Sequence, residues 1–244
     1  MRDLIYRQRK DLVLTIVVRE YTKTNNPVSS GHIASGYRLD LSPATIRHIL
    51  AELEDQGLLT HPHTSAGRVP TQDGYRYYVD NLMKEIQILE DEKLRINREY
   101  EQGVRDLEEA VEKTSQVISD LTHYTSIISV DGRSDKMFCR GTSYIVSYPE
   151  SQDLNTIRNI LAALEQKQQL LDLINRDLEH KITIYIGHEI ACSHIEGCSL
   201  AVSSYSSSKG PGGRIAVLGP TRMDYPKVVS ALDYCSKLMS EILS

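Results

Sequence analysis

The sequence of 244 residues predicts an α+β fold in three parts. An amphipathic helix that starts at a proline, followed by a basic hairpin with a glycine hinge, predicts a winged helix-turn-helix unit over residues 1–80. A heptad pattern predicts a long helix over residues 81–122. Alternating strand and helix signals predict a small sheet domain covered by helices over residues 123–244.

Three helices are expected in the first unit. Apolar residues recur with helical spacing from Leu4 to Tyr21, and a shorter helix is expected from about Ser30 to Tyr37. Ser42 can cap a third helix that begins at Pro43 and runs to Gly57, because proline suits the first helical position. The apolar residues of this third helix fall at spacings of three and four and predict a buried stripe made of Ile46, Ile49, Leu50 and Leu53.

Thr45, Arg47 and His48 lie off this stripe, near the N-terminal end of the third helix. In a helix-turn-helix the helix after the turn enters the major groove of DNA with its N-terminal residues against base edges. The pattern therefore predicts a DNA-reading helix, with Ser42 and Pro43 at its start included in the contact surface.

A wing is expected after this helix. Two short strands, Leu58–Thr60 and Arg68–Pro70, flank the turn-forming residues 61–67. Such a wing lies along DNA phosphates, where Arg68 would supply charge. The remaining contacts would come from His63, Thr64, Ser65 and the amide of Gly67. The alternative is a surface hairpin beside an ordinary amphipathic helix, which the whole arrangement disfavours.

The charge of the chain is unevenly distributed. The net charge is −5, but residues 1–84 carry 11 Lys/Arg and 9 Asp/Glu, so this part is +2 and the remainder is −7. The asymmetry favours DNA binding by the first part. Because +2 is a modest charge, specific contacts and bivalent binding would have to add to the general attraction.

Four cysteines without a CxxC pair, and no evident export signal, indicate a reducing cytoplasm. The basic N-terminus followed by the apolar residues 12–18 imitates a signal peptide, but Arg19-Glu20 ends the apolar run, and the segment is better interpreted as the first helix. No run approaches the roughly 20 apolar residues that a membrane span needs, so no membrane partner is expected.

A heptad pattern runs from Leu82 to Leu121. If the helix is continuous, this pattern is typical of a coiled coil between two copies of the chain. A linker helix that packs on its own C-terminal domain explains the pattern equally well. The residues expected at a dimer seam are Leu82, Ile86, Leu89 and Ile96.

The C-terminal part alternates strand and helix signals. Strands are expected at residues 142–146, 182–186, 199–205 and 214–218, the last two antiparallel and joined by a flexible turn. A pair of helices is expected within residues 154–177 and a closing helix over 228–243.

No enzyme, cofactor or metal centre is expected. The glycine-rich residues 210–213 lack the Gly-Lys-Ser/Thr ending of a phosphate loop and precede a strand. Glu189 and Glu196 have no nucleophile or oxyanion site around them. An Arg222–Asp224 pair is expected to order a loop rather than to bind an effector. The potential metal ligands fit no standard zinc spacing, and they are His188, Cys192, His194 and Cys198.

Two separate stretches resemble one known family. PATIR at residues 43–47, PHTSAGRVPT at 62–71 and GYRYYVD at 74–80 closely resemble the N-terminal domain of the heat-inducible transcription repressors of the HrcA type. IAVLGPTRMDY at residues 215–225 resembles the C-terminal signature of that family. The resemblance implies a dimeric repressor of chaperone genes that binds an inverted-repeat operator of the CIRCE type. It also implies a GAF-like C-terminal domain, chaperonin as a partner that supports activity, and loss of activity on heat stress.

The middle of the chain departs from that family. Only residues 129–138 separate Ile128 from Cys139, where the family carries a long first portion of the GAF-like domain with an inserted dimerising subdomain. We therefore expect a reduced GAF-like domain with fewer strands, and dimer contacts that cannot be carried over from the family. A ligand-sensing regulator with a small-molecule site in that domain is the alternative function.

Overall fold

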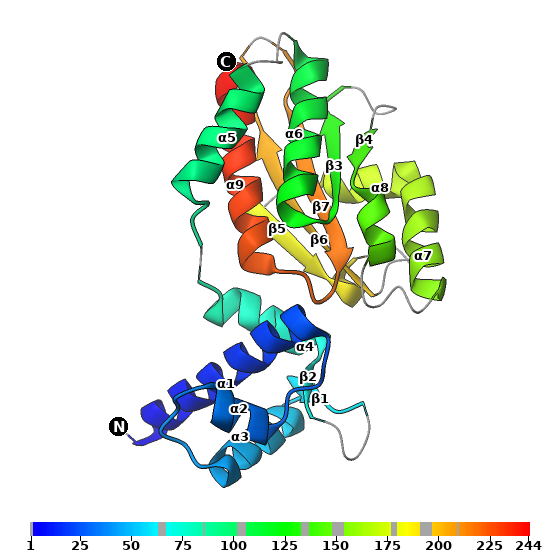
Figure 1. Ribbon diagram of the computed structural model, residues 1–244. Helices are drawn as coiled ribbons and strands as arrows, with labels where there is room; N and C mark the ends of the chain where they lie inside the picture. The colour runs from blue at the N-terminus through cyan, green and yellow to red at the C-terminus, as the bar shows by residue number, and fades with distance from the viewer. Residues whose placement is uncertain are drawn as a thin grey trace. The chain divides into compact units, whose positions relative to one another are not determined.

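The computed structural model describes residues 2–62, 67–84, 86–101, 106–132, 137–147, 154–176, 180–190, 197–208 and 210–244. The chain divides into two compact units, Met1–Lys84 and Glu85–Ser244 (Figure 1). In the described ranges, no helix has the length and apolar character needed to cross a membrane.

The first unit is mostly helical and holds one two-stranded antiparallel sheet, in which Leu59 pairs with Pro70 and Thr60 with Val69. The helices and strands expected in the first 70 residues are present. Residues 72–80, for which the pattern predicted no element, and residues 81–82, predicted as the start of the long helix, form a short α-helix and a π-helical turn. The elements are α1 (Arg2–Thr24), α2 (Ser30–Gly36), α3 (Pro43–Asp55), β1 (Leu59–Thr60), β2 (Val69–Pro70), α4 (Gln72–Tyr77) and η1 (Tyr78–Leu82).

Helix α3 packs its apolar stripe against α1 and α2. All four residues of the predicted stripe are buried, and so are residues of α1 that face them. The Ser42 hydroxyl caps α3 by accepting a hydrogen bond of 3.1 Å from the amide of Thr45, as the sequence predicts. The buried stripe fixes which side of α3 remains exposed. The buried residues of α1 and α2 include Val13, Leu14, Val17 and Ile33.

The second unit is built on a five-stranded antiparallel sheet with the order β4-β3-β7-β6-β5. The sheet is formed by β3 (Thr125–Val130), β4 (Met137–Arg140), β5 (Ile182–Ile186), β6 (Cys198–Tyr205) and β7 (Gly213–Pro220). The helical elements are α5 (Glu90–Glu101), α6 (Leu107–Thr122), η2 (Thr142–Ser147), α7 (Leu154–Glu165), α8 (Lys167–Ile174), η4 (Gly187–Glu189) and α9 (Tyr225–Ile242).

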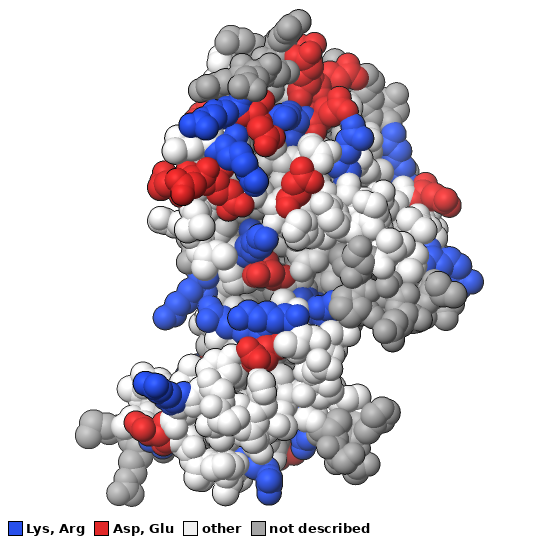
Figure 2. Space-filling model, viewed as in Figure 1, with Lys and Arg blue, Asp and Glu red and all other residues white. Residues whose placement is uncertain are grey.

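Helices cover both faces of this sheet (Figure 1). Side chains of successive strand residues point to opposite faces. Ile127 packs in a core with Leu170 and Ile174 of α8, whereas the next residue, Ile128, lies on the face covered by α6 and α9. Both faces are therefore apolar and buried. Lys, Arg, Asp and Glu side chains are mixed over the face of this unit that the upper part of Figure 2 shows.

The predicted long helix over residues 81–122 is wrong. Two helices, α5 and α6, occupy this stretch, and residues 86–89 lie outside both. The Tyr100 hydroxyl of α5 donates a 2.6 Å hydrogen bond to Thr114 of α6, so the two helices pack on each other. A heptad pattern records only which residues are apolar, and intrachain packing satisfies it as well as a coiled coil does.

In the second unit one further expectation fails, and two strands were not predicted. Residues 142–146, predicted as a strand, lie in the 3₁₀ helix η2, because Gly141 with φ of 78° turns the chain away from the sheet after β4. Strands β3 and β4 were not predicted at all. Every residue of β3 is buried, so its sequence shows no alternation of apolar and polar residues.

Candidate nucleic-acid interface

Helix α3 exposes a polar surface at its N-terminal end. Ser42, Pro43, Arg47 and His48 are exposed, and Thr45 is half-buried with its hydroxyl 2.9 Å from that of Ser42. The stripe of apolar residues on the other side of the helix is fully packed. The structure therefore brings together five of the residues that the sequence predicted to contact DNA.

Arg38 is a cation near this surface that the sequence pattern did not single out. It lies in the turn between α2 and α3, is exposed, and makes no ion pair with any residue that the structure describes. Its place between the two helices of a predicted helix-turn-helix was the signal that could have identified it. Its guanidinium is free to contact a phosphate.

The predicted wing residues divide into two groups. His63, Thr64 and Ser65 lie outside the described residues. Gly67 and Arg68 lie at the base of the hairpin, where Arg68 and Val28 exchange backbone hydrogen bonds of 2.8 and 2.9 Å. The Arg68 guanidinium is 2.7 Å from the Glu54 carboxylate of α3. Arg68 is therefore held against the body of the unit.

Glu52 joins α1 to the exposed side of α3. Its carboxylate accepts a 2.8 Å hydrogen bond from Tyr6, lies 3.2 Å from the Lys10 ammonium and lies 3.1 Å from the His48 imidazole. The Tyr6 hydrogen bond is the largest influence on this carboxyl and, with Lys10 and His48, lowers its pKa against the opposing effect of desolvation. The same carboxylate thus orients one predicted DNA-contacting residue, His48.

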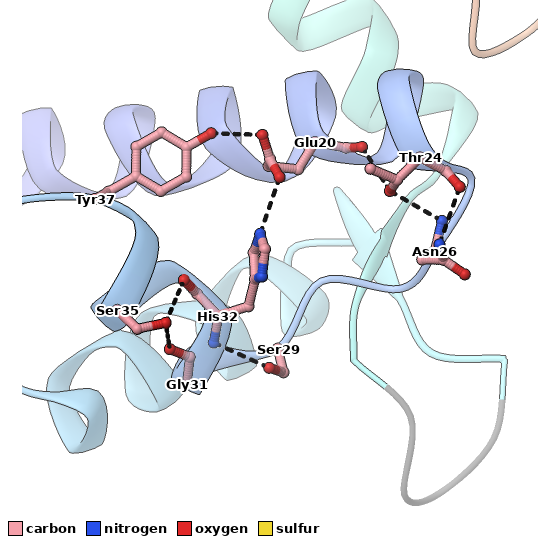
Figure 3. Close-up of polar contacts among 8 residues, drawn as sticks. All are labelled: Glu20, Thr24, Asn26, Ser29, Gly31, His32, Ser35 and Tyr37. Atoms are coloured by element: carbon pink, nitrogen blue, oxygen red, sulfur yellow. Dashed lines mark hydrogen bonds and ion pairs between the residues drawn. The ribbon is translucent and has the colours of Figure 1, made fainter.

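Glu20 of α1 contacts a residue at each end of α2 (Figure 3). Its carboxylate accepts a 2.7 Å hydrogen bond from the Tyr37 hydroxyl and lies 2.9 Å from the His32 imidazole. These two hydrogen bonds, that of Tyr37 first, lower the pKa of the Glu20 carboxyl. Burial and the Glu20 carboxylate raise the pKa of Tyr37 to about 12. Helix α2 is held in place by charged contacts as well as by Ile33.

The four residues expected at a dimer seam do not share one helical face. Ile96 is 2% exposed inside the second unit, whereas Leu89 is 75% exposed and Ile86 45% exposed, both outside any helix. Leu82 ends the π-helical turn of the first unit. On the same inner side of α5 as Ile96, Asn97 accepts a 2.8 Å hydrogen bond from Tyr234 of α9. The predicted seam is corrected accordingly: Ile96 belongs to the core of its own chain.

Comparison with known proteins connects this geometry to one family. Residues 128–229 match the family model described as HrcA protein C terminal domain. The heat-inducible transcription repressor HrcA of Pelotomaculum thermopropionicum is 31% identical over 334 residues, covering 96% of this chain and 96% of that protein. The repressor of the same name from Geobacter sulfurreducens is 28% identical over 334 residues, covering 97% and 98%.

A crystal structure described as that of a hypothetical protein has the same fold. Its TM-score is 0.79 at 19% identity, and the match covers 96% of this chain and 98% of that chain. Each alignment with the two repressors is 334 positions long, whereas this chain has 244 residues. At least 90 positions of each alignment are therefore gaps in this chain. The chain is therefore a shortened relative of these repressors.

Proposed function

We propose that this chain, which belongs to the HrcA family of heat-inducible transcription repressors, represses transcription by reading an operator with helix α3. The observation that carries the proposal is that α3 has one buried apolar side and one exposed polar side. One side is a fully buried apolar stripe, and the N-terminal end of the other side exposes Arg47 and His48. Members of the family are transcription repressors rather than enzymes.

Helices α1 to α3 with the β1–β2 hairpin support the assignment of a winged helix-turn-helix. In this arrangement Arg47 and His48 approach base edges, because the recognition helix presents its N-terminal residues to the major groove. Phosphate contacts come from Arg38, from Ser42 and Pro43 at the start of α3, and from the wing residues His63, Thr64 and Ser65. The carboxylates of Glu52 and Glu54 keep the charge of the surface low, which supports a site that depends on specific contacts rather than on a large positive field.

The operator is an inverted repeat of the CIRCE type and the repressor is a dimer. Each half of an inverted repeat presents the same bases only to a reader related by a twofold axis, so two copies of α3 are needed. The second unit supplies the dimer contacts, and the exposed Ile86 and Leu89 are the seam residues that remain available for them. The second unit is a reduced GAF-like domain in this proposal, since a family model for the C-terminal domain matches residues 128–229.

Heat inactivates the repressor by unfolding its second unit, and chaperonin restores it. Loss of the dimer contacts would halve the number of contacts to the operator even if α3 stayed folded, because bivalent binding depends on the connection between the two readers. Inactivation by heat is supported by the chain's membership of a family of heat-inducible repressors. Operator binding after mild heating, with and without chaperonin and ATP, measures it directly.

The test of DNA reading uses genomic fragments selected by the purified protein and then sequenced. We expect an inverted repeat, and we expect Arg47→Ala to weaken binding by about 1–3 kcal/mol and to relax the preference at one base pair of each half-site. Arg38→Ala is the matched control, because it removes the same charge from a position expected to contact only phosphate. Equal losses on all sequences from both variants would contradict the assignment of α3 as the reader.

A further inference from the structure

One carboxylate on α3 holds both sides of the β1–β2 hairpin. Glu54 lies near the C-terminal end of the helix, and its two oxygens contact different residues. One oxygen contacts the imidazole Nδ1 of His61, which directly follows β1. The other is 2.7 Å from the guanidinium of Arg68, which directly precedes β2. The Glu54 and Arg68 side chains are each 24% exposed, so this contact is largely shielded from water.

At its base the hairpin is also fixed by the buried Leu59 and by hydrogen bonds from Thr71 to the carbonyl oxygens of Gly57 and Leu58, whereas Glu54 contacts the side nearer the turn. Strands β1 and β2 pair through only two residues each, and an isolated ladder of this length is not stable in water. The backbone bridge between Arg68 and Val28 adds a second support. Gly67 permits this bridge, because a Cβ there would lie 2.5 Å from the carbonyl carbon of Val28. The backbone bridge holds the β2 side alone, whereas Glu54 holds both sides.

A carboxylate at this position is unfavourable for DNA binding if charge alone matters. Negative charge near a DNA-contacting helix repels phosphates, so its removal should strengthen binding. Here His61 and Arg68 surround the carboxylate. Partial burial raises the pKa of Glu54, but the His61 hydrogen bond and the Arg68 charge together bring it below its ordinary value. The carboxylate therefore stays ionised and bound to both partners at neutral pH.

We propose that Glu54 is a positioning residue that sets the orientation of the β1–β2 hairpin relative to the reading helix α3. The inference rests on the proposed DNA-reading function of α3. Because Glu54 is on the helix and its two partners are on the two sides of the hairpin, the contact fixes helix and hairpin as one surface. Both can then contact the same stretch of DNA without an entropic cost for ordering the hairpin at binding.

The neighbouring residue provides a matched control. Asp55 is exposed, and its carboxylate makes no hydrogen bond or ion pair in the part of the chain that the structure describes. Glu54→Gln and Asp55→Asn change the net charge by the same amount, one residue apart on the same helix. General electrostatics predicts that both variants bind DNA as tightly as the wild type or more tightly. The positioning role predicts opposite outcomes for the two.

The experiment measures binding of the full chain to an operator fragment, together with hydroxyl-radical footprints. We expect Asp55→Asn to bind at least as tightly as the wild type, and Glu54→Gln to bind about tenfold more weakly. The footprint of Glu54→Gln should lose the backbone protection given by the hairpin and keep that given by α3. Equal affinities and footprints for the two variants would overturn the proposal.

A double-mutant cycle with Arg68→Gln tests whether Glu54 acts through its partner. If Glu54 positions the hairpin through Arg68 as well as His61, the combined effect of Glu54→Gln and Arg68→Gln on the footprint should be less than the sum of their separate effects, and the part of the Glu54→Gln effect that remains once Arg68 is replaced reports the His61 contact. If Arg68 contacts phosphate independently of Glu54, the effects of the two substitutions add fully, and the positioning role through Arg68 fails.

Amide exchange of the free protein separates this inference from the proposed function. The amides of residues 59–60 and 68–69 should exchange faster in Glu54→Gln than in Asp55→Asn, whether or not DNA is bound. If the wild type has no sequence preference for DNA but the two variants still differ in exchange, the proposed DNA-reading function is contradicted and the Glu54 contact with the hairpin is supported. If the wild type binds DNA with sequence preference but the two variants exchange at the same rate, the positioning role of Glu54 alone is contradicted.

Discussion

The two units of this chain are held together in different ways. In the first unit, the carboxylates of Glu20, Glu52 and Glu54 each accept side-chain contacts from at least one other element. In the second unit, a five-stranded sheet is packed on both faces by apolar side chains. Its ion pairs, such as Arg140–Glu112 and Lys181–Asp233, lie on the more exposed surface.

The difference follows from the sizes of the two units. A unit of 84 residues buries a smaller fraction of its surface than a larger domain does, so contacts at its periphery matter more for its stability. Two of these carboxylates, those of Glu52 and Glu54, belong to α3, the helix that carries Arg47 and His48. If this comparison is correct, truncation of a buried apolar side chain should lower the stability of the second unit most. Loss of a single polar contact should measurably lower the stability of the first unit.

The largest effect is expected from Leu200→Ala in β6. Leu200 is fully buried in the core between the sheet and helices α7 and α8. Truncation of such a residue costs about 2–5 kcal/mol, from lost burial and from the cavity that remains. Denaturant unfolding should show this loss, and amide exchange should become faster in residues 86–244 alone. Equally faster exchange in residues 2–84 would show that the two units do not unfold separately.

The next effect is expected from Gly74→Ala in α4 of the first unit. A Cβ at Gly74 would lie 2.0 Å from the carbonyl oxygen of Leu58, so α4 must move away from the start of β1. Such overpacking costs about 1–3 kcal/mol. The control is Gly36→Ala, where a Cβ meets no atom within 4 Å, and this change should be neutral or slightly stabilising. Equal thermal midpoints for the two variants would contradict the close approach.

Local signals in the sequence predicted most of the helices and the strands β1, β2, β5, β6 and β7. Helix α3 is the clearest case, because its capping serine, its first-turn proline and its apolar spacing all lie within 13 residues. Strand β3 was missed because a fully buried strand shows no alternation. The single long helix was wrong, because apolar spacing does not say whether the partner is another chain or α6 and α9.

The candidate interface was predicted to a similar extent. The exposure of Arg47 and His48 follows from the helical period alone. The contacts that hold them do not, because Glu52 and Tyr6 are 46 residues apart and Glu54 and Arg68 are 14 apart in a region without regular spacing. A pair of this kind requires the packing of α1, α3 and the hairpin, which no local pattern encodes. Arg68 was accordingly predicted as a phosphate contact with no account of its carboxylate partner.

A smaller effect is expected from Tyr37→Phe. The change removes the hydroxyl that donates to Glu20 and leaves the ring in place, so the stability of the first unit should fall by about 0.5–1.5 kcal/mol. Glu20→Gln combined with Tyr37→Phe tests whether the two residues act on each other, since the effects of coupled residues do not add. Amide exchange in α2 reports the loss, and fully additive effects would show that the hydrogen bond contributes nothing.

The smallest expected effect is a difference in acid sensitivity. The pKa of Glu20 in the folded chain lies below its ordinary value of 4.5, because of hydrogen bonds from Tyr37 and His32. A carboxyl with a lowered pKa stabilises the fold above the unfolded value, and this stabilisation is lost as the pH falls through the folded value. Between about pH 5 and 3 the wild type should therefore lose more stability than Glu20→Gln.

The control for this titration is Asp40→Asn. Asp40 is an exposed carboxylate of the same unit and makes no ion pair within the described ranges. Removal of this group should leave the slope of stability against pH close to that of the wild type. Amide exchange of α1 and α2 over the acid range gives the slope for each variant. If Glu20→Gln and Asp40→Asn share one slope, the contacts of Glu20 do not stabilise the first unit, and the contrast between the two units is weaker than proposed.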